Sequence, residues 1–148
     1  MKTSHSVLVA AVVGTAGLVL SERQNRRRLA LQAAEMHQTW IAELAGNPEL
    51  RAVWAPPGGE LPDEEHKNLL HANRLISLLA AKFRAGLFDR HSMRVQAQWL
   101  MEREIARIYW RTLGSLREGE AIDRTDRMFN AILSAEYTAA VGKDPVAA

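Results

Sequence analysis

The sequence predicts an all-α protein in which a single N-terminal transmembrane helix runs into an irregular bundle of about five helices. An uncharged apolar segment covers residues 6–21 and is followed at once by a cluster of arginines. Beyond it, apolar residues recur every three or four positions, and no segment alternates as a half-buried strand does. We therefore divide the 148 residues into an anchor with a basic collar (1–28), a helical domain (29–141) and a flexible tail (142–148).

The apolar segment reads SVLVAAVVGTAGLVLS. As a helix it would be about 24 Å long, whereas a bilayer core is about 30 Å thick. It can still span a bilayer, because the flanking arginines reach the lipid–water interface with their long side chains. A signal peptide would carry a small-x-small cleavage site, and a buried soluble helix would show a polar face. We find no convincing example of either and expect a membrane anchor.

The basic collar consists of Arg23, Arg26, Arg27 and Arg28. By the positive-inside rule it places the body in the cytoplasm and the short N-terminus outside, in a single-pass protein of the cell membrane. These arginines also attract anionic lipid headgroups, by about 1 kcal/mol for each basic residue near the surface. Residues 1–28 hold five of the 19 basic but one of the 17 acidic residues, so the remainder has a net charge of −2. A mildly acidic body argues against nucleic-acid binding.

The first helix of the domain shows one apolar face with steps of three or four residues, formed by Leu29, Ala33, Met36, Trp40 and Leu44. No strong helix breaker separates this face from the anchor, so the two can form one continuous rod. Gly46 ends the helix. Asn47 as N-cap and Pro48 at the first position then begin a short helix, which ends in a loop over residues 55–59.

Two of the later helices have clear ends. One begins at Asp63, after Pro62, and ends at Gly86; its apolar face consists of Leu69, Ala72, Ile76, Leu79 and Phe83. The last helix begins near Asp123 and ends at Gly142; its apolar residues are Phe129, Ile132, Leu133 and Tyr137.

The region between these two helices is also helical, with Asp89 or Ser92 as its N-cap. Its apolar positions at helical spacing are Val95, Trp99, Leu100, Ile105, Ile108, Thr112 and Leu116. Gly114 and Gly119 mark its end. Whether the helix breaks at residues 101–104 stays open from the sequence.

The sequence offers little catalytic chemistry. It contains no cysteine, which excludes disulfides, thiol catalysis and cysteine metal sites. His66 and His71 are five residues apart, whereas two metal ligands on one helix face need a spacing of four. No nucleophile motif and no phosphate-binding glycine loop is present. We therefore expect no metal, no cofactor and no catalytic residue, and a protein that is not an enzyme.

Four tryptophans are many for a chain of this size. We expect Trp40, Trp99 and Trp110 to pack where helices cross. Trp54 differs, because it ends a short helix just before two prolines. Its ring can occupy a partner's groove or the membrane interface, which makes Trp54 a candidate partner-binding residue.

Four short motifs follow one another along the chain: NPEL followed by Trp54, LHANRLIS at 70–77, RIYW at 107–110, and RMF at 127–129 with Glu136-Tyr137. In this order and spacing they resemble an actinobacterial family, the domain of unknown function 6082. The resemblance covers residues 29–141. It implies a small helical protein, often with an apolar N-terminal segment, and assigns no activity. It draws attention to Asn73, Arg107 and Glu136 as a candidate polar network, which we expect to be structural and not a ligand site.

These observations lead to one functional expectation and two alternatives. We expect a non-enzymatic, membrane-anchored domain whose partners are the lipid bilayer and an unidentified protein or a second copy of itself. Its role would be interaction, localisation or assembly at the cytoplasmic membrane face. The first alternative is a small-molecule-binding regulator with a site between helices. The second is a subunit of a larger assembly that buries the apolar segment.

Overall fold

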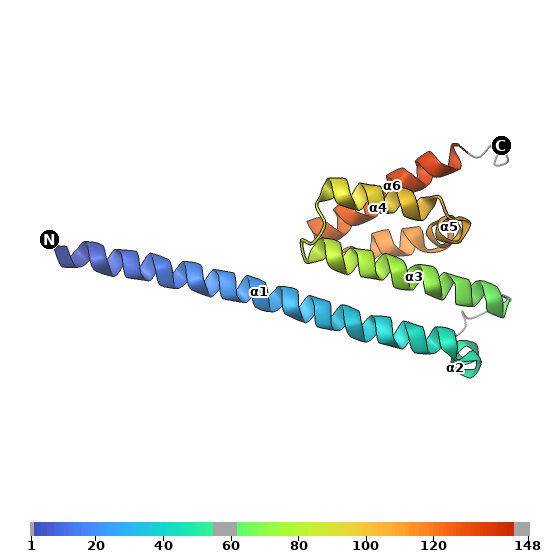
Figure 1. The fold of residues 1–148 in the computed structure, drawn as a ribbon, viewed down its shortest axis with the longest axis horizontal. Coiled ribbons are helices and arrows are strands. Elements are labelled where there is room, and N and C mark those ends of the chain that lie inside the picture. The colour runs from blue at the N-terminus through green and yellow to red at the C-terminus, as the bar shows by residue number, and fades with distance from the viewer. Residues whose placement is uncertain (1, 55–61, 144–148) are drawn as a thin grey trace.

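The computed structural model describes the backbone of residues 2–54 and 62–143, and their side chains from Val19 onward. Its helices are α1 (Lys2–Gly46), α2 (Pro48–Val53), α3 (Asp63–Arg84), α4 (Arg90–Met101), α5 (Glu104–Gly119) and α6 (Arg124–Val141). These described residues contain no strand. The predicted all-α class is therefore confirmed, and Figure 1 shows a long rod lying beside a helical bundle.

The rod is α1, one uninterrupted helix of 45 residues. At 1.5 Å per residue it is about 68 Å long. Its second half packs antiparallel to α3, while its N-terminal part extends beyond the bundle (Figure 1). The prediction that the apolar segment and the helix after it form a single rod is therefore confirmed.

The predicted transmembrane helix is not found among the described residues. Within the described part of the chain, no helix combines the length and the hydropathy needed to span a bilayer. The predicted span, residues 6–21, lies mostly outside the residues whose side chains are described. The predicted loop at 55–59 and most of the predicted tail also lie outside them.

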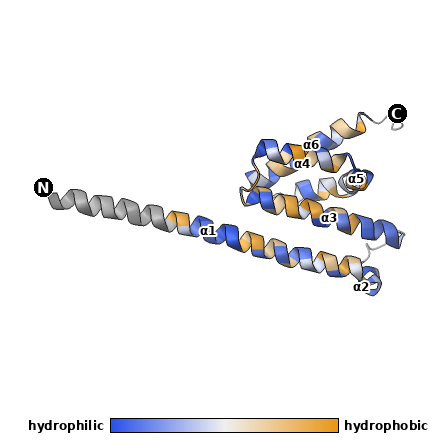
Figure 2. Ribbon diagram, in the orientation of Figure 1, coloured by the Kyte–Doolittle hydropathy of each residue, from blue (hydrophilic) through white to orange (hydrophobic). Residues whose placement is uncertain are grey.

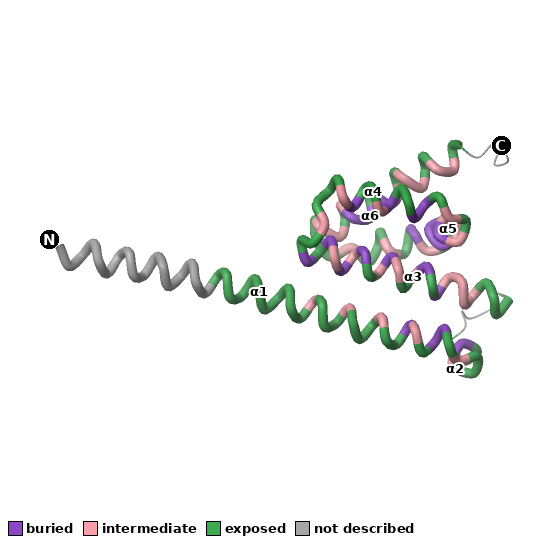
Figure 3. Tube along the Cα trace, in the orientation of Figure 1, coloured by how far each residue is buried: buried purple, intermediate pink, exposed green. Residues whose placement is uncertain are grey.

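The main hydrophobic core lies between α3, α4, α5 and α6, and its most deeply buried side chains are Ile76, Met93, Leu100, Met101 and Leu133. A smaller cluster joins α1 to α3 and consists of Ile41, Leu44, Ala45 and Leu70. Figure 3 shows the described part of α1 exposed along most of its length, with buried turns only near α2. The bundle therefore has its own core, and the buried apolar residues of the described part of α1 lie in its last turns.

The apolar face predicted for α1 does not face the bundle. Leu29, Met36 and Trp40 are 55%, 75% and 44% exposed, and only the last member of that face is buried. The side of α1 that faces α3 is displaced from the predicted face by one residue, and it contains Ala30 and Ala34. Small alanine side chains permit close helix packing, so the larger aliphatic side chains remain outside.

A similar offset occurs in α4 and α5. Val95, Trp99 and Leu116 are exposed, and the buried positions of these helices are Met93, Ala97, Leu100, Met101, Ala106, Tyr109, Trp110 and Gly114. The expectation that all tryptophans except Trp54 pack in the core is therefore right for Trp110 and wrong for Trp40 and Trp99.

Gly114 does not end a helix, contrary to the prediction, because α5 continues to Gly119. A Cβ at Gly114 would lie 3.1 Å from the Trp110 side chain. The glycine therefore leaves room for the indole ring one turn earlier in the same helix.

The helix N-termini predicted from neighbouring residues are confirmed in detail. The Asn47 side chain accepts hydrogen bonds from the backbone N–H groups of Glu49 and Leu50, at 3.0 and 3.2 Å. Asp89 is the N-cap of α4 and accepts from the Ser92 N–H at 2.7 Å, a hydrogen bond that lowers the pKa of the Asp89 carboxyl. Asp123 caps α6. These short-range contacts are the ones that sequence spacing predicts best.

The question left open at residues 101–104 is settled by a break between α4 and α5. Arg103 is extended there, with φ −96° and ψ 129°. Its guanidinium lies 3.4 Å from the centroid of the Trp99 ring and donates to the Trp99 carbonyl. The cation–π contact holds the exposed indole over the break.

Arg51, which the sequence did not single out, joins three helices at the α2 corner. It is 5% exposed. Its Nε and Nη2 donate to the two carboxylate oxygens of Asp63 on α3, at 2.8 and 2.7 Å, and its Nη1 donates to the carbonyl of Ala45 on α1. The hydrogen bond from Arg51 lowers the pKa of the Asp63 carboxyl. We call this group the Arg51 clasp.

We expect Arg51→Met to lower the melting temperature by several degrees, because the substitution removes a two-pronged ion pair and leaves the Ala45 carbonyl without its donor. Lys67→Met is the matched control, since Lys67 forms an exposed ion pair with Glu64 at 3.7 Å. Thermal unfolding followed by circular dichroism measures both. Equal, small shifts for the two variants would show that the clasp is unimportant.

The clasp also sets a pH dependence. The folded state lowers the pKa of the Asp63 carboxyl, so its contribution is complete above the unfolded value of about 3.9. That contribution is lost as the pH falls through the lower, folded value. The difference in melting temperature between wild type and Arg51→Met should therefore shrink in acid. A difference that stays constant from neutral pH to below this range would contradict the assignment.

Candidate functional site

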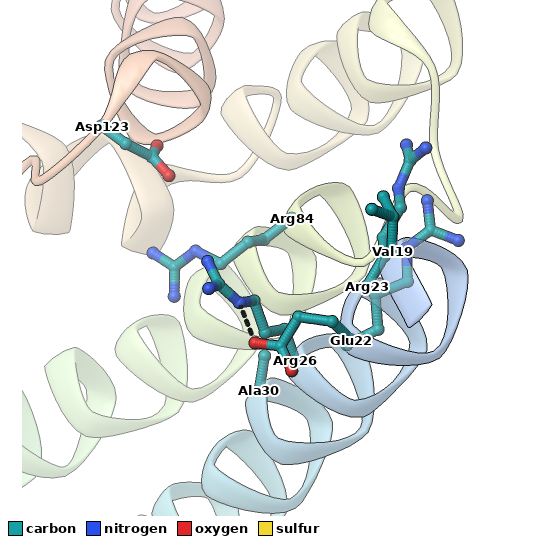
Figure 4. Close-up of a pocket in the computed structure, with 8 residues that line it drawn as sticks. Val19, Glu22, Arg23, Arg26, Ala30, Arg84 and Asp123 are labelled. Carbon is teal, nitrogen blue, oxygen red and sulfur yellow. Dashed lines mark hydrogen bonds and ion pairs between the residues drawn. The ribbon is translucent and has the colours of Figure 1, made fainter. Parts of the chain in front are cut away.

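Three collar arginines meet the bundle around an open hollow. Arg23, Arg26 and Arg27 on α1 and Arg84 at the end of α3 line a space of about 720 Å³, and Asp123 lies across it at the start of α6 (Figure 4). Figure 2 shows the collar as a hydrophilic band on α1, where the rod leaves the bundle. Arg28, the fourth predicted collar residue, is exposed and does not line this space.

The charges around the hollow are only partly compensated. Arg26 Nε donates to Glu22 Oε1 at 2.7 Å, and Arg84 is paired with Asp126. Arg23 and Arg27 form no ion pair with any described residue. A surface with two uncompensated guanidinium groups attracts anions.

Arg27 lies against the turn that follows α3. Gly86, in the turn after α3, has φ +74°, as expected for a glycine that ends a helix. A Cβ at this glycine would lie 3.2 Å from Arg27 Nη2. The collar therefore packs directly on the α3–α4 turn.

A second surface lies at the other end of the packed part of α1. Trp54 is 60% exposed, and its ring meets that of Trp40 edge to face, with centroids 6.0 Å apart and planes at 84°. Val53 and Met36 are exposed nearby on α2 and α1. The predicted partner-binding residue is thus exposed, and it lies next to the outward-facing side of α1.

Asn73 belongs to a polar network, but with partners other than those predicted. Tyr109 Oη donates to Asn73 Oδ1 at 2.7 Å and accepts from Arg117 Nε at 2.7 Å. Arg117 Nη2 also donates to Asn73 Oδ1 and to Ser77 Oγ, at 2.9 and 2.6 Å. Burial raises the pKa of the Tyr109 hydroxyl. The network links α3 to α5.

Arg107 and Glu136 lie elsewhere. Arg107 Nη1 donates to the Met101 carbonyl at 2.9 Å, and Glu136 Oε1 lies 3.4 Å from Arg94 Nε. Both side chains line a small hollow between α4, α5 and α6. Arg107 is two residues from Tyr109, about 200° round the helix, and so lies on the other side of α5 from the contacts of Asn73. The structure thus brings Asn73 together with Tyr109, Arg117 and Ser77, and it places Arg107 and Glu136 together at the other hollow.

The buried polar groups are satisfied within the protein. In the described residues, every buried side-chain nitrogen and oxygen has a hydrogen-bond partner. The same residues contain no group of three histidine, aspartate or glutamate side chains arranged to hold a metal ion. The hydrogen bonds of the network around Asn73 tie α3 to α5, as those of a structural element do.

We expect Tyr109→Phe to destabilise the protein by about 1 kcal/mol, because Arg117 loses an acceptor and Asn73 loses a donor. Tyr137→Phe is the control, since Tyr137 is half-buried and its hydroxyl bonds to no described residue. Urea unfolding of the two variants measures the difference. If both variants were as stable as wild type, the network would not contribute to stability.

Comparisons with known proteins place the chain in a family. A model of a family of unknown function (DUF6082) matches residues 3–148. No curated protein and no solved structure matches the chain. Because the match spans nearly the whole sequence, the chain belongs to this family of unknown function, DUF6082.

Proposed function

We propose that the protein is a non-enzymatic, membrane-anchored helical domain that assembles with a second copy of itself at the cytoplasmic face of the membrane. The observation that supports this proposal is the exposed apolar stripe of α1, formed by Leu29, Ala33, Met36 and Trp40. A stripe of this kind on a long helix is the usual interface of helix pairs.

The spacing of the stripe fits a two-stranded coiled coil. Its members follow one another at steps of four, three and four residues, and the same alternation continues toward the N-terminus through Arg26 and Glu22. Positions repeating every 3.5 residues on average stay on one seam of a supercoiled helix. In a parallel pair each of these positions faces its own equivalent, so Glu22 and Arg26 stay paired within each chain and the apolar members of the stripe make the contact.

The membrane anchor favours a second copy as the partner. An anchor over residues 6–21 would hold all copies in the same orientation and confine them to a surface. Two parallel α1 helices then present identical stripes to each other at the same height, which is the arrangement of a two-fold interface. The bundle lies on the offset face of α1, which leaves the stripe accessible.

The proposed anchor also decides between the two roles considered for Trp54. Gly46, at the end of α1, is 25 residues beyond Ser21, which corresponds to about 38 Å along the helix. An upright rod would hold Trp54 far from the lipid interface. Trp54 therefore belongs to the protein-contacting surface in this proposal.

We expect the full-length protein, at native expression level, to stay in the membrane pellet after a carbonate wash and to be released by detergent with an unchanged mass. Val13→Arg should move it to the carbonate-soluble fraction, because a charge at the centre of a span costs about 2.5–3.5 kcal/mol. Val13→Leu is the control. Soluble full-length protein, or a shortened exported product, would overturn the anchor.

We expect a Met36→Cys variant in native membranes to form a disulfide-linked dimer on mild oxidation, because facing seam positions bring Cα atoms within the range of a disulfide. The chain has no cysteine of its own, so any link must form at position 36. Glu35→Cys is the control, an exposed position about 100° away on the same helix. Equal crosslinking of the two variants would contradict self-association through the stripe.

A further inference from the structure

We propose that the end of the bundle beside the arginine collar docks on the surface of an anionic phospholipid bilayer. In this arrangement Leu87 and Ile122 enter the interfacial layer and the hollow binds lipid phosphate groups. The inference rests on the proposed membrane anchor. It adds a second contact with the bilayer, made by the domain and not by the transmembrane segment.

The first observation is a pair of exposed aliphatic side chains at this end. Leu87 in the α3–α4 connection is 63% exposed, and Ile122 in the α5–α6 connection is 88% exposed. Figure 1 shows both connections at the end of the bundle that points toward the N-terminus of α1. The ion pair between Arg84 and Asp126 ties the two connections together, and the Ile122 N–H donates to Asp126 Oδ2 at 3.2 Å.

The second observation is the charge next to these loops. The hollow brings four arginines together with two carboxylates, Glu22 and Asp123. Glu22 is engaged by Arg26, and the Asp123 carboxylate accepts the N–H of Asp126 as the N-cap of α6. The arginines without ion pairs, Arg23 and Arg27, remain to bind an anion. Guanidinium groups bind phosphate oxygens with two parallel hydrogen bonds.

The third observation is the height of this surface along the rod. Arg23 and Arg27 follow Ser21, the last residue of the apolar segment, by two and six positions. At 1.5 Å per residue they lie about 3–9 Å beyond the segment, within the headgroup layer of a bilayer that the segment spans. Because Arg27 packs on Gly86, the neighbouring Leu87 is held close to the same level.

These three features identify the bilayer as the occupant. Apolar side chains flanked by basic residues are the usual composition of interfacial membrane contacts. A protein partner would need to reach the same place between the bundle and the headgroups. The cytoplasmic leaflet is anionic, and it already faces this surface in the proposed orientation.

The experiment uses the full-length, cysteine-free chain with single labelling sites. Leu87→Cys, Ile122→Cys and Val53→Cys carry an environment-sensitive fluorophore, and Val53 is the control because it is exposed at the far end of the packed rod. Each variant is reconstituted in phosphatidylcholine vesicles with or without phosphatidylglycerol. Insertion is read from a blue shift of emission and from quenching by brominated lipids, and far-UV circular dichroism verifies the fold.

We expect the labels at positions 87 and 122 to be quenched several-fold more than the label at position 53, with a larger effect in anionic vesicles. Adding Arg23→Gln and Arg27→Gln should remove the dependence on phosphatidylglycerol. If the protein resists carbonate but all three labels behave alike, or the arginine substitutions change nothing, membrane docking of the bundle is overturned while the anchor stands. If carbonate extracts the protein, the anchor itself has failed.

Discussion

The antiparallel packing of α1 on α3 is the constraint on which the other features depend. It uses a face on which small alanines, Ala30 and Ala34, are followed by the buried Ile41 and Leu44, which pack against Leu70 of α3. Because α1 packs on α3 through this face, its aliphatic stripe points outward and the collar lies against the end of α3. The exposed surfaces of the protein are thus consequences of how one helix pair is packed.

The Arg51 clasp is one of the directional contacts that fix where along α3 the rod lies. Another is formed by Gln38 of α1, whose amide donates to the Arg74 carbonyl at 2.6 Å and accepts from Arg74 Nε at 3.1 Å. Arg51 contacts the end of α1 and the beginning of α3 with directional hydrogen bonds, and these hold at one register only. That register places Arg27 beside Gly86 at the opposite end of the helix pair.

The sequence predicted most of the helix ends correctly, because these depend on short-range interactions. The caps at Asn47, Asp89 and Asp123 and the stop at Gly86 each depend on a few neighbouring residues, and the structure confirms them. The apolar faces predicted for α3 and α6 are largely buried, whereas in α4 and α5 burial selects alanine, methionine and aromatic residues over the predicted Val95 and Leu116. Arg51 gave no signal at all, since a buried arginine is recognised only through its partners from distant segments.

The stripe of α1 and the side of α1 that faces the bundle occupy different sectors of one helix, which makes the two proposals compatible. Arg23, Arg27, Ala30 and Ala34 follow one another at helical spacing, so the hollow and the face packed on α3 share one sector, about 100° from the stripe. Glu22 and Arg26 lie at the border between these sectors and neutralise each other within one chain, so they add no net charge to the hollow. Arg23 and Arg27 lie on the bundle side, where a second copy at the stripe does not cover them. Self-association would therefore leave the phosphate-binding charges of each copy facing the headgroups, and two copies would present two such sites side by side.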